Sequence, residues 1–189
     1  MNVYDFDNTI YDGESVLHFF FFYIKKSPHL IKYIPKVLYA LFKYKSGRIT
    51  VEKALEDYAP FVEDFFKSIK DIRADSKEFW DLHMNNIKPF YNEVRKSDDV
   101  IVTASPEITM HEICKRLNIS HCVGSLIDED TGKITRLCLR SRKVPAFFEA
   151  FPDAVIENFY TDSPKNDAPL IDIAEHAFIV KGNKIRQIK

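Results

Sequence analysis

Residues 3–14 of the chain read VYDFDNTIYDGE, and this stretch indicates how the rest is organised. Its apolar opening predicts a short β-strand, and two acids one residue apart, Asp5 and Asp7, follow that strand. Like charges at such close range repel each other and raise each other's pKa, so a divalent cation is the usual means of neutralising them. The alternative is a solvated turn, in which Asp and Asn are common because they form local hydrogen bonds.

The composition is that of an ordinary globular protein. The chain has 189 residues, 46% of them hydrophobic, and a net charge of -1, which suits one core domain with or without a large insertion. The three cysteines, Cys114, Cys122 and Cys138, show no CxxC spacing, which argues against a disulfide framework or a zinc site. Asp5 and Asp7 interrupt the N-terminus before any apolar run, so we expect no signal peptide and a reducing, cytoplasmic environment.

The pattern over residues 15–75 predicts an all-helical block. Apolar residues recur at helical spacing through 27–45 and again through 50–69. Between Ser15 and Val51 the chain has seven Lys or Arg and no Asp or Glu. Such a segment can face a nucleic acid, an anionic membrane or an anionic substrate, and the alternative is a helical subdomain with a solvated lysine face. Its apolar run is too short to span a bilayer.

Strands and helices alternate in the second half of the chain. A helix with Ser76 as its N-cap is predicted over 76–87. Strands are predicted at 98–105, 120–128, 155–162, 177–182 and 183–188, with a hairpin within 129–139 and helices at 106–119, 143–151 and 166–176. This alternation predicts an α/β fold of the Rossmann-like kind, with a parallel sheet and helices on both of its faces.

The helical block lies between the first and second predicted strands, so it forms an insertion. We therefore divide the chain into a core, residues 1–14 and 76–189, and a helical cap, residues 15–75. Open α/β sheets bind ligands outside the carboxyl ends of their strands. The cap is thus expected to cover Asp5 and Asp7.

Further polar residues stand near the ends of the other predicted strands. Thr103 lies at the end of one strand, Asp162 and Asp167 follow another, and Lys143 opens a helix. The carboxyl ends of parallel strands meet at one edge, so these side chains should share a pocket with the first pair of acids. Carboxylates with one hydroxyl and one ammonium suit a phosphate and Mg²⁺, which takes oxygen ligands. Zinc is not expected, because neither His nor Cys joins the set.

Four motifs in this order resemble those of the haloacid dehalogenase-like superfamily of phosphohydrolases. DFDNT (5–9) is similar to its first motif, DxDxT, and VIVT (100–103) to its second, an apolar strand ending in Thr or Ser. Lys143 matches the third motif, and DSPKND (162–167), with two acids separated by four residues, matches the fourth. The insertion after the first motif resembles the helical cap of the phosphoserine-phosphatase-like branch. Asn8 stands where many members have Gly, and Asn tolerates the positive φ that the turn needs.

The resemblance implies a role for each acid. Asp5 would be the nucleophile that forms an aspartyl-phosphate. Asp7 would protonate the leaving alcohol and later deprotonate the attacking water. The carboxylates of Asp5 and Asp162, with the main-chain carbonyl of Asp7, would bind Mg²⁺. Asp167 would be a further metal ligand or hold a metal-bound water.

The resemblance also implies binding residues. Thr103, Ala104 and Lys143 would bind the phosphate oxygens. Glu14 stands nine residues after the nucleophile, where the serine-type phosphatases carry a glutamate that contacts the substrate, so it is a candidate substrate residue. Lys165 and the six histidines are expected outside the site.

The expected function is hydrolysis of a phosphomonoester with Mg²⁺, through an aspartyl-phosphate. Asp7 argues against a dehalogenase, which lacks the second acid, while a phosphotransferase and, remotely, a non-catalytic binding module stay as alternatives. Glu14 suggests a small amino-alcohol phosphate as substrate. The basic aromatic cap, and a layout similar to the phosphatidylglycerophosphatase C branch, suggest a phosphorylated lipid headgroup instead. We expect no nucleic-acid partner and a cytoplasmic protein, peripheral at the inner membrane face if the cap contacts lipid.

Overall fold

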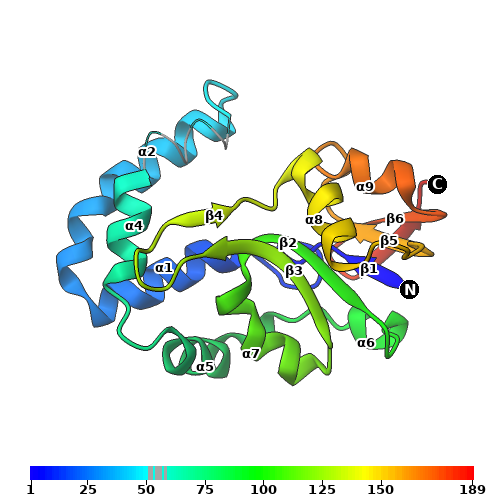
Figure 1. Ribbon diagram of the computed structural model, residues 1–189, viewed down its shortest axis with the longest axis horizontal. Helices are drawn as coiled ribbons and strands as arrows, with labels where there is room; N and C mark the ends of the chain where they lie inside the picture. The colour runs from blue at the N-terminus through cyan, green and yellow to red at the C-terminus, as the bar shows by residue number, and fades with distance from the viewer. Residues whose placement is uncertain (51–52, 54–56, 58) are drawn as a thin grey trace.

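The structure, a computed structural model, describes residues 1–50, 53, 57 and 59–189, and within these residues seven strands form one sheet (Figure 1). The strands are β1 (Asn2–Tyr4), β2 (Val100–Pro106), β3 (His121–Ile127), β4 (Ile134–Arg136), β5 (Asn158–Thr161), β6 (His176–Lys181) and β7 (Lys184–Gln187). Their order across the sheet is β4-β3-β2-β1-β5-β6-β7.

The five central strands are parallel, whereas the two outer strands, β4 and β7, run antiparallel to their neighbours. The predicted α/β fold is confirmed, and the parallel arrangement expected for the sheet holds for its five central strands but not for β4 and β7. The reason is the short connection before each outer strand, because a short turn joins only antiparallel strands and a parallel pair needs a long crossover.

Helices alternate with strands along the second half of the chain. In the first half, the described helices follow β1 without another strand between them. The α-helices are α1 (Ser15–Lys26), α2 (Ile34–Lys45), α4 (Ala59–Lys67), α5 (Ile72–His83), α6 (Phe90–Val94), α7 (Glu107–Leu117), α8 (Lys143–Ala150) and α9 (Ala168–Ile173). Three 3₁₀ turns among the described residues are η1 (Pro28–Tyr33), η2 (Met84–Asn86) and η3 (Arg140–Arg142).

Helices cover both faces of the sheet, as predicted. Successive residues of a strand point to opposite faces. Val3 therefore packs in one hydrophobic cluster with Phe147 of α8, while Tyr4 packs in the other with Trp80 of α5. All four side chains are buried, so β1 lies between two hydrophobic layers at the centre of the core.

The described part of the segment between β1 and α5 contains α1, η1, α2 and α4 and none of the seven strands, and Figure 1 shows α1, α2 and α4 beyond the end toward which β2 and β3 point. Aromatic side chains hold it together. Phe20 of α1 and Phe65 of α4 are buried with ring centroids 5.4 Å apart. The helix expected over 50–69 is found at α4, and its residues 51–52, 54–56 and 58 lie outside the described residues. No helix among those described is both long and apolar enough to span a bilayer.

The helix expected to begin after Ser76 begins one turn earlier. Its N-cap is Asp71, whose Oδ1 accepts a hydrogen bond from the Ala74 main-chain nitrogen at 2.9 Å. Ser76 is instead a buried residue within α5. Ser and Asp are both good N-caps, and Asp71 lies where the chain enters the helix, so the prediction of Ser76 is wrong. The boundary drawn between residues 75 and 76 consequently falls inside α5.

The hairpin formed by β3 and β4 reaches from the sheet to the helical segment. Gly132, in its turn, has φ +72°, and a Cβ there would lie 2.4 Å from the main-chain oxygen of Glu63 in α4. Near the turn, the Arg73 guanidinium binds both carboxylate oxygens of Glu129, at 2.8 and 3.0 Å. The hairpin therefore packs directly against α4 at a point where only glycine fits.

Candidate active site

One cavity of about 540 Å³ lies at the carboxyl ends of the central strands and extends between the hairpin and α1, α2 and α4. All eight residues that the sequence predicted for the site line it: Asp5, Asp7, Glu14, Thr103, Ala104, Lys143, Asp162 and Asp167. They follow β1, belong to β2, open α8 and follow β5. Strand ends that are far apart in the chain thus place their polar side chains in one pocket, as the parallel sheet requires.

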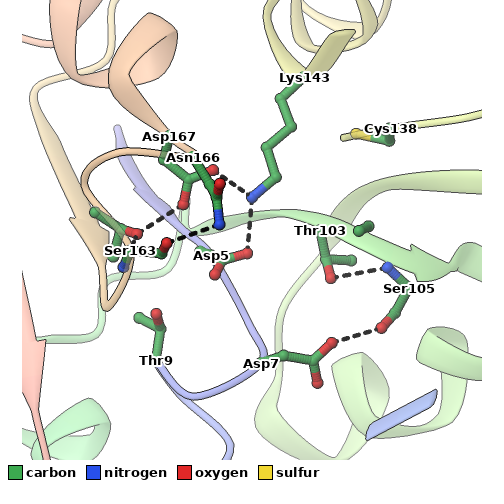
Figure 2. A network of polar contacts seen from close by, with 12 residues as sticks. Asp5, Asp7, Thr9, Thr103, Ser105, Cys138, Lys143, Ser163, Asn166 and Asp167 are labelled. Atoms are coloured by element: carbon green, nitrogen blue, oxygen red, sulfur yellow. Dashed lines mark hydrogen bonds and ion pairs between the residues drawn. The ribbon is translucent and has the colours of Figure 1, made fainter. Parts of the chain in front are cut away.

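Lys143 is the central cation of this pocket. Its Nζ lies 2.8 Å from Asp5 Oδ1 and 2.7 Å from Asp167 Oδ1, and the side chain is buried (Figure 2). Burial lowers the pKa of the Lys143 ammonium, but the two carboxylates more than offset this and hold the pKa above its usual value. Asp167 is in turn fixed by the Thr161 hydroxyl, which donates to its Oδ2 at 2.6 Å.

Asp5 is the acid at the end of β1. Burial raises the pKa of its carboxyl to about 8, the charge of Asp167 adds to this rise, and Lys143 opposes it. Its second oxygen, Oδ2, has no hydrogen-bond partner among those described, and Figure 2 shows it directed into the pocket away from Lys143. Asp5 therefore offers one anchored oxygen and one that faces the cavity.

Asp7 is held differently, by donors on both oxygens. The Ser15 main-chain nitrogen donates to Oδ1 at 2.7 Å, and the Ser105 hydroxyl donates to Oδ2 at 2.8 Å (Figure 2). Burial raises the pKa of the Asp7 carboxyl, and these hydrogen bonds oppose the rise. The Ser105 main-chain nitrogen donates to Thr103 Oγ1 at 3.1 Å, so the end of β2 holds Ser105 and Thr103 in fixed positions beside each other.

The turn after β1 carries Asn8 and Glu14. Asn8 has φ +58°, which confirms that it adopts the positive φ expected at this position. Its side-chain amide donates to Glu14 Oε1 at 2.8 Å, so Glu14 is tied to the turn at the rim of the cavity. The buried Lys88 ammonium donates to the main-chain oxygen of Asn8 and so stabilises the turn from beneath.

Asp162 closes the pocket on the β5 side. Its main-chain nitrogen donates to Thr9 Oγ1 at 2.8 Å, and the Thr9 hydroxyl donates back to Asp162 Oδ1 at 3.3 Å. Burial raises the pKa of the Asp162 carboxyl, and the hydrogen bond from Thr9 opposes this. The Thr of the first motif thus links the end of β1 to the end of β5.

The donor set of the pocket fits a hard divalent cation. Among the described residues, five acidic side chains line the cavity against two basic ones, so a cation would offset excess negative charge. All of these acids offer oxygen, the ligand that Mg²⁺ prefers. No three acidic, His or Cys side chains of the described residues converge closely enough to hold an ion by themselves. The predicted ligand set does not require this, because it includes the main-chain carbonyl of Asp7.

Ser105, which ends the strand predicted at 98–105, was expected either to form a turn or to bind phosphate, and the structure shows that it donates a hydrogen bond to Asp7. Thr161 and Lys88 were not predicted. Thr161 had a usable signal, because it is a small polar residue next to a predicted motif. Lys88 had none, since it reaches Asn8 from a loop 80 positions away. The exposed Lys165 does not line the cavity, and neither does any histidine of the described chain, as expected.

The fold and the site define an α/β enzyme with an acidic pocket at the carboxyl edge of its sheet. Residues 3–172 match the family model of haloacid dehalogenase-like hydrolases, so the chain belongs to that family. The resemblance stated from the four motifs is therefore confirmed at the level of the family. Comparison with curated proteins gives no match.

Solved structures share the fold at low sequence identity. A protein of unknown function from Bordetella pertussis Tohama I is 18% identical, with a TM-score of 0.75 over 94% of this chain and 87% of that one. A phosphoserine phosphohydrolase-like protein from Francisella tularensis subsp. tularensis SCHU S4 is 18% identical, with a TM-score of 0.60 over 94% and 86%. Phosphoserine phosphatase from T. onnurineus, in complex with NDSB-201, is 18% identical, with a TM-score of 0.56 over 94% and 81%. These likenesses concern the fold.

Proposed function

We propose that this chain is a Mg²⁺-dependent phosphomonoester hydrolase that works through an aspartyl-phosphate. One observation carries the proposal: Lys143 Nζ bridges Asp5 Oδ1 and Asp167 Oδ1 at 2.8 and 2.7 Å, while Asp7 stands two residues beyond Asp5 in the same cavity. An anchored carboxylate, a neighbouring acid and an ammonium are the groups that phosphoryl transfer to and from an aspartate needs. Two of the structures with this fold are described as phosphoserine phosphatase or phosphatase-like, which supports the same reaction class.

The proposed reaction has two steps. In the first, the cavity-facing oxygen of Asp5 attacks phosphorus, the bond to the alcohol oxygen breaks, and Asp7 donates a proton to the leaving alcohol. In the second, Asp7 takes a proton from water as the water attacks the aspartyl-phosphate, which releases phosphate and restores Asp5. The hydrogen bonds from Ser15 and Ser105 keep Asp7 oriented through both steps.

The phosphate oxygens would be bound by Lys143, Thr103 and Ala104. Thr103 Oγ1 accepts a hydrogen bond from Ser105, so its own proton is directed elsewhere and is available to a phosphate oxygen. Lys143 is charged and buried, which makes its attraction for the transferring group strong. These donors would offset the negative charge that develops during transfer.

Mg²⁺ would be held by the carboxylates of Asp5 and Asp162 and the main-chain carbonyl of Asp7. Asp167 would serve as a further ligand or hold a metal-bound water. When bound, the ion would screen the carboxylates from the incoming phosphate and polarise a phosphoryl oxygen. Thr9 and Thr161 would orient Asp162 and Asp167 from behind.

The test is hydrolysis of p-nitrophenyl phosphate with Mg²⁺, after treatment with EDTA, and after readdition of Mg²⁺. We expect activity that is lost with EDTA and restored by Mg²⁺.

Asp5→Asn should lower kcat by several orders of magnitude. Asp12→Asn is the matched control, because Asp12 is an exposed acid of the same turn that does not line the cavity. An Asp5→Asn variant with more than a few per cent of parental activity would contradict the covalent route. Transfer of phosphate to added alcohol in preference to water would indicate a phosphotransferase.

A second candidate function is action on a phosphorylated lipid headgroup at an anionic membrane. The observation in its favour is the outer face of η1 and α2, where Ile31, Leu38, Tyr39 and Phe42 are each more than half exposed. Basic groups accompany them, since Lys43 Nζ lies 4.7 Å from the Tyr39 ring centroid. Each basic residue near an anionic bilayer contributes about 1 kcal/mol. Such contact would put a cytoplasmic protein at the inner face of the membrane.

Co-sedimentation with vesicles tests this second candidate. Binding to phosphatidylserine-containing vesicles but not to neutral ones, weaker at physiological than at low salt, is the expected result. Vesicle binding that does not depend on lipid charge, together with high activity on a small soluble phosphate, would contradict the lipid function. The remaining candidate would then be a phosphatase of soluble metabolites.

A further inference from the structure

The cavity has two chemically different ends. The end at the strands carries the carboxylates and Lys143. The other end lies between the hairpin and α1, α2 and α4. Its walls consist of Val16, Leu17, Phe20, Val37, Ala40, Phe61, Val62, Phe65, Phe66, Ile127, Ile134, Leu137 and Leu139. We call this second end the apolar chamber.

The helical segment supplies no charge to the chamber. Every described residue between 16 and 66 that lines the cavity has an apolar side chain. The lysines of α1, such as Lys25 and Lys26, are exposed and do not line it. A small polar substrate would find no polar partner on these helices beyond Glu14 at the rim. These helices therefore offer no charged partner to the polar remainder of a phosphorylated amino acid, and the two basic residues that line the cavity, Arg140 and Lys143, both belong to the core.

The chamber is not simply the packed core of the cap. Phe20 and Phe65 are buried in that core, but Phe61, Phe66 and Leu137 are only partly buried, and all five line the cavity. Large apolar side chains of α4 and of the segment that follows β4 thus leave part of their surface facing the same cavity. A ligand with an apolar chain would remove that surface from water, which is favourable.

The volume limits the ligand to one chain. The cavity of about 540 Å³ includes the polar end, which the phosphate occupies. Sites of roughly 300–1,000 Å³ enclose ligands of drug-like size. What remains beyond the phosphate accommodates one chain of moderate length and is too small for the two acyl chains of a phospholipid.

We infer that the substrate is a phosphomonoester of an alcohol that bears a single apolar chain, with that chain bound in the apolar chamber. The inference rests on the proposed phosphatase function and deepens it. The phosphate lies at Lys143, the alcohol oxygen faces Asp7, and the chain extends between α2 and the hairpin.

Chain length is the variable that tests the chamber. Ethyl, hexyl and decyl phosphate have leaving alcohols of similar acidity, so differences in kcat/KM report binding of the chain. Full burial of one methylene contributes about 0.8 kcal/mol, or about a fourfold gain in kcat/KM. From ethyl to hexyl phosphate, measured below the micelle threshold, we expect a gain of at least about tenfold, since four methylenes are at least partly buried.

Two variants of α2 separate the chamber from the outer surface. Ala40→Trp places a bulky side chain in the chamber and should lower the ratio of hexyl to ethyl kcat/KM at least about fivefold. Leu38→Trp is the matched control on the same helix, because Leu38 is 52% exposed and does not line the cavity. It should keep the parental ratio. Thermal melting of each variant verifies that it is folded.

Affinity for hexyl- and ethylphosphonate, which are not hydrolysed, gives a readout that does not depend on turnover. Tighter binding of hexylphosphonate supports the chamber even if no phosphate ester is hydrolysed, in which case only the proposed function fails. Activity on ethyl phosphate with no gain in kcat/KM for hexyl phosphate, and equal affinities for the two phosphonates, would overturn the inference that the chamber binds the chain. The proposed phosphatase function would be unaffected by that result. A higher kcat/KM for a two-chain phosphatidate than for decyl phosphate would overturn the inference that the substrate bears a single chain.

Discussion

The Ser105 hydroxyl donates a hydrogen bond of 2.8 Å to Asp7 Oδ2, and the two residues stand 98 positions apart in the chain. Ser105 lies near the end of β2 and Asp7 just after β1, which pairs with β2. The same hydroxyl lies 3.0 Å from that of Ser15, at the start of α1. The proposed proton donor is therefore oriented by the sheet and by the first helix of the cap together.

Ser105→Ala should slow the enzyme without unfolding it. The substitution removes one hydrogen bond to a charged group, of roughly 1.5–3 kcal/mol, and leaves Ser15 as the remaining donor to Asp7. We expect kcat on ethyl phosphate to fall roughly 10- to 100-fold with a small change in KM. Ser76→Ala, at a buried serine remote from the cavity, should leave both constants unchanged. A parental kcat for Ser105→Ala would remove the orienting role of this hydrogen bond.

Asp7→Asn should distinguish substrates by their leaving groups. An alkyl phosphate needs protonation of its leaving oxygen, so turnover should fall by about 10² to 10⁴. Formation of the aspartyl-phosphate from p-nitrophenyl phosphate should fall much less, because nitrophenolate leaves without a proton. Stopped-flow measurement should then show a burst of nitrophenolate followed by slow turnover. Equal losses in the rate of aspartyl-phosphate formation from the two substrates would exclude Asp7 as the acid.

Gly132→Ala should disturb the contact between the hairpin and α4. A left-handed residue other than Gly costs about 1–2 kcal/mol, and here the new Cβ would also lie 2.4 Å from the main-chain oxygen of Glu63. Gly182→Ala is the matched control, since Gly182 also has positive φ but has open space around it. We expect Gly132→Ala to lower the free energy of unfolding by at least about 1 kcal/mol more than the control does. Equal losses in urea denaturation would show that the close approach to Glu63 is absent.

Asp99→Asn should change the pH dependence of stability. Burial raises the pKa of the Asp99 carboxyl, although Tyr91 and the Lys96 main chain donate to its Oδ2. Because the folded-state pKa is raised, the ionised group destabilises the fold above that pKa, and the cost disappears as the pH falls and the group is protonated. The variant should therefore be more stable than the parent at pH 7. This advantage should shrink toward pH 4, as measured by urea denaturation at both values. A stability advantage of Asp99→Asn that grows as the pH falls would contradict a raised pKa for Asp99.

Asp71→Ala should destabilise the protein, whereas Ser76→Ala should not remove a helix cap. Asp71 accepts the hydrogen bond of the Ala74 nitrogen, and loss of an N-cap costs about 1 kcal/mol. Ser76 lies inside α5, where Ala has the higher helix propensity. Thermal unfolding of the two variants compares the positions directly. A larger loss for Ser76→Ala would place the cap where the sequence suggested it.

Local sequence was sufficient to predict the acidic edge of the sheet. Asp5 and Asp162 each follow a short apolar strand, and Thr103 lies within one. Strand periodicity, together with the rule that ligands bind at the carboxyl ends of strands, predicts that these residues lie together. The order of the four motifs then predicted the family. These signals are short-range, which is why they can be read from the chain.

Local sequence did less well where two similar signals competed. Asp71 and Ser76 are both good N-caps, and the choice between them depends on where the chain leaves the preceding turn. The antiparallel direction of β4 and β7 was not predicted, although a hairpin was expected within 129–139. The direction of an edge strand depends on the length of the connection before it, because a short turn joins only antiparallel strands.

Other features depend on tertiary structure alone. Lys88 meets Asn8, and Gly132 approaches Glu63, from loops 80 and 69 positions away. The apolar chamber exists only because α2, α4 and the hairpin stop short of complete contact. Apolar side chains that fill a core and those that line a cavity have the same composition and periodicity. Which of the two they do is set by the distance between elements, and that distance results from the packing of the whole molecule.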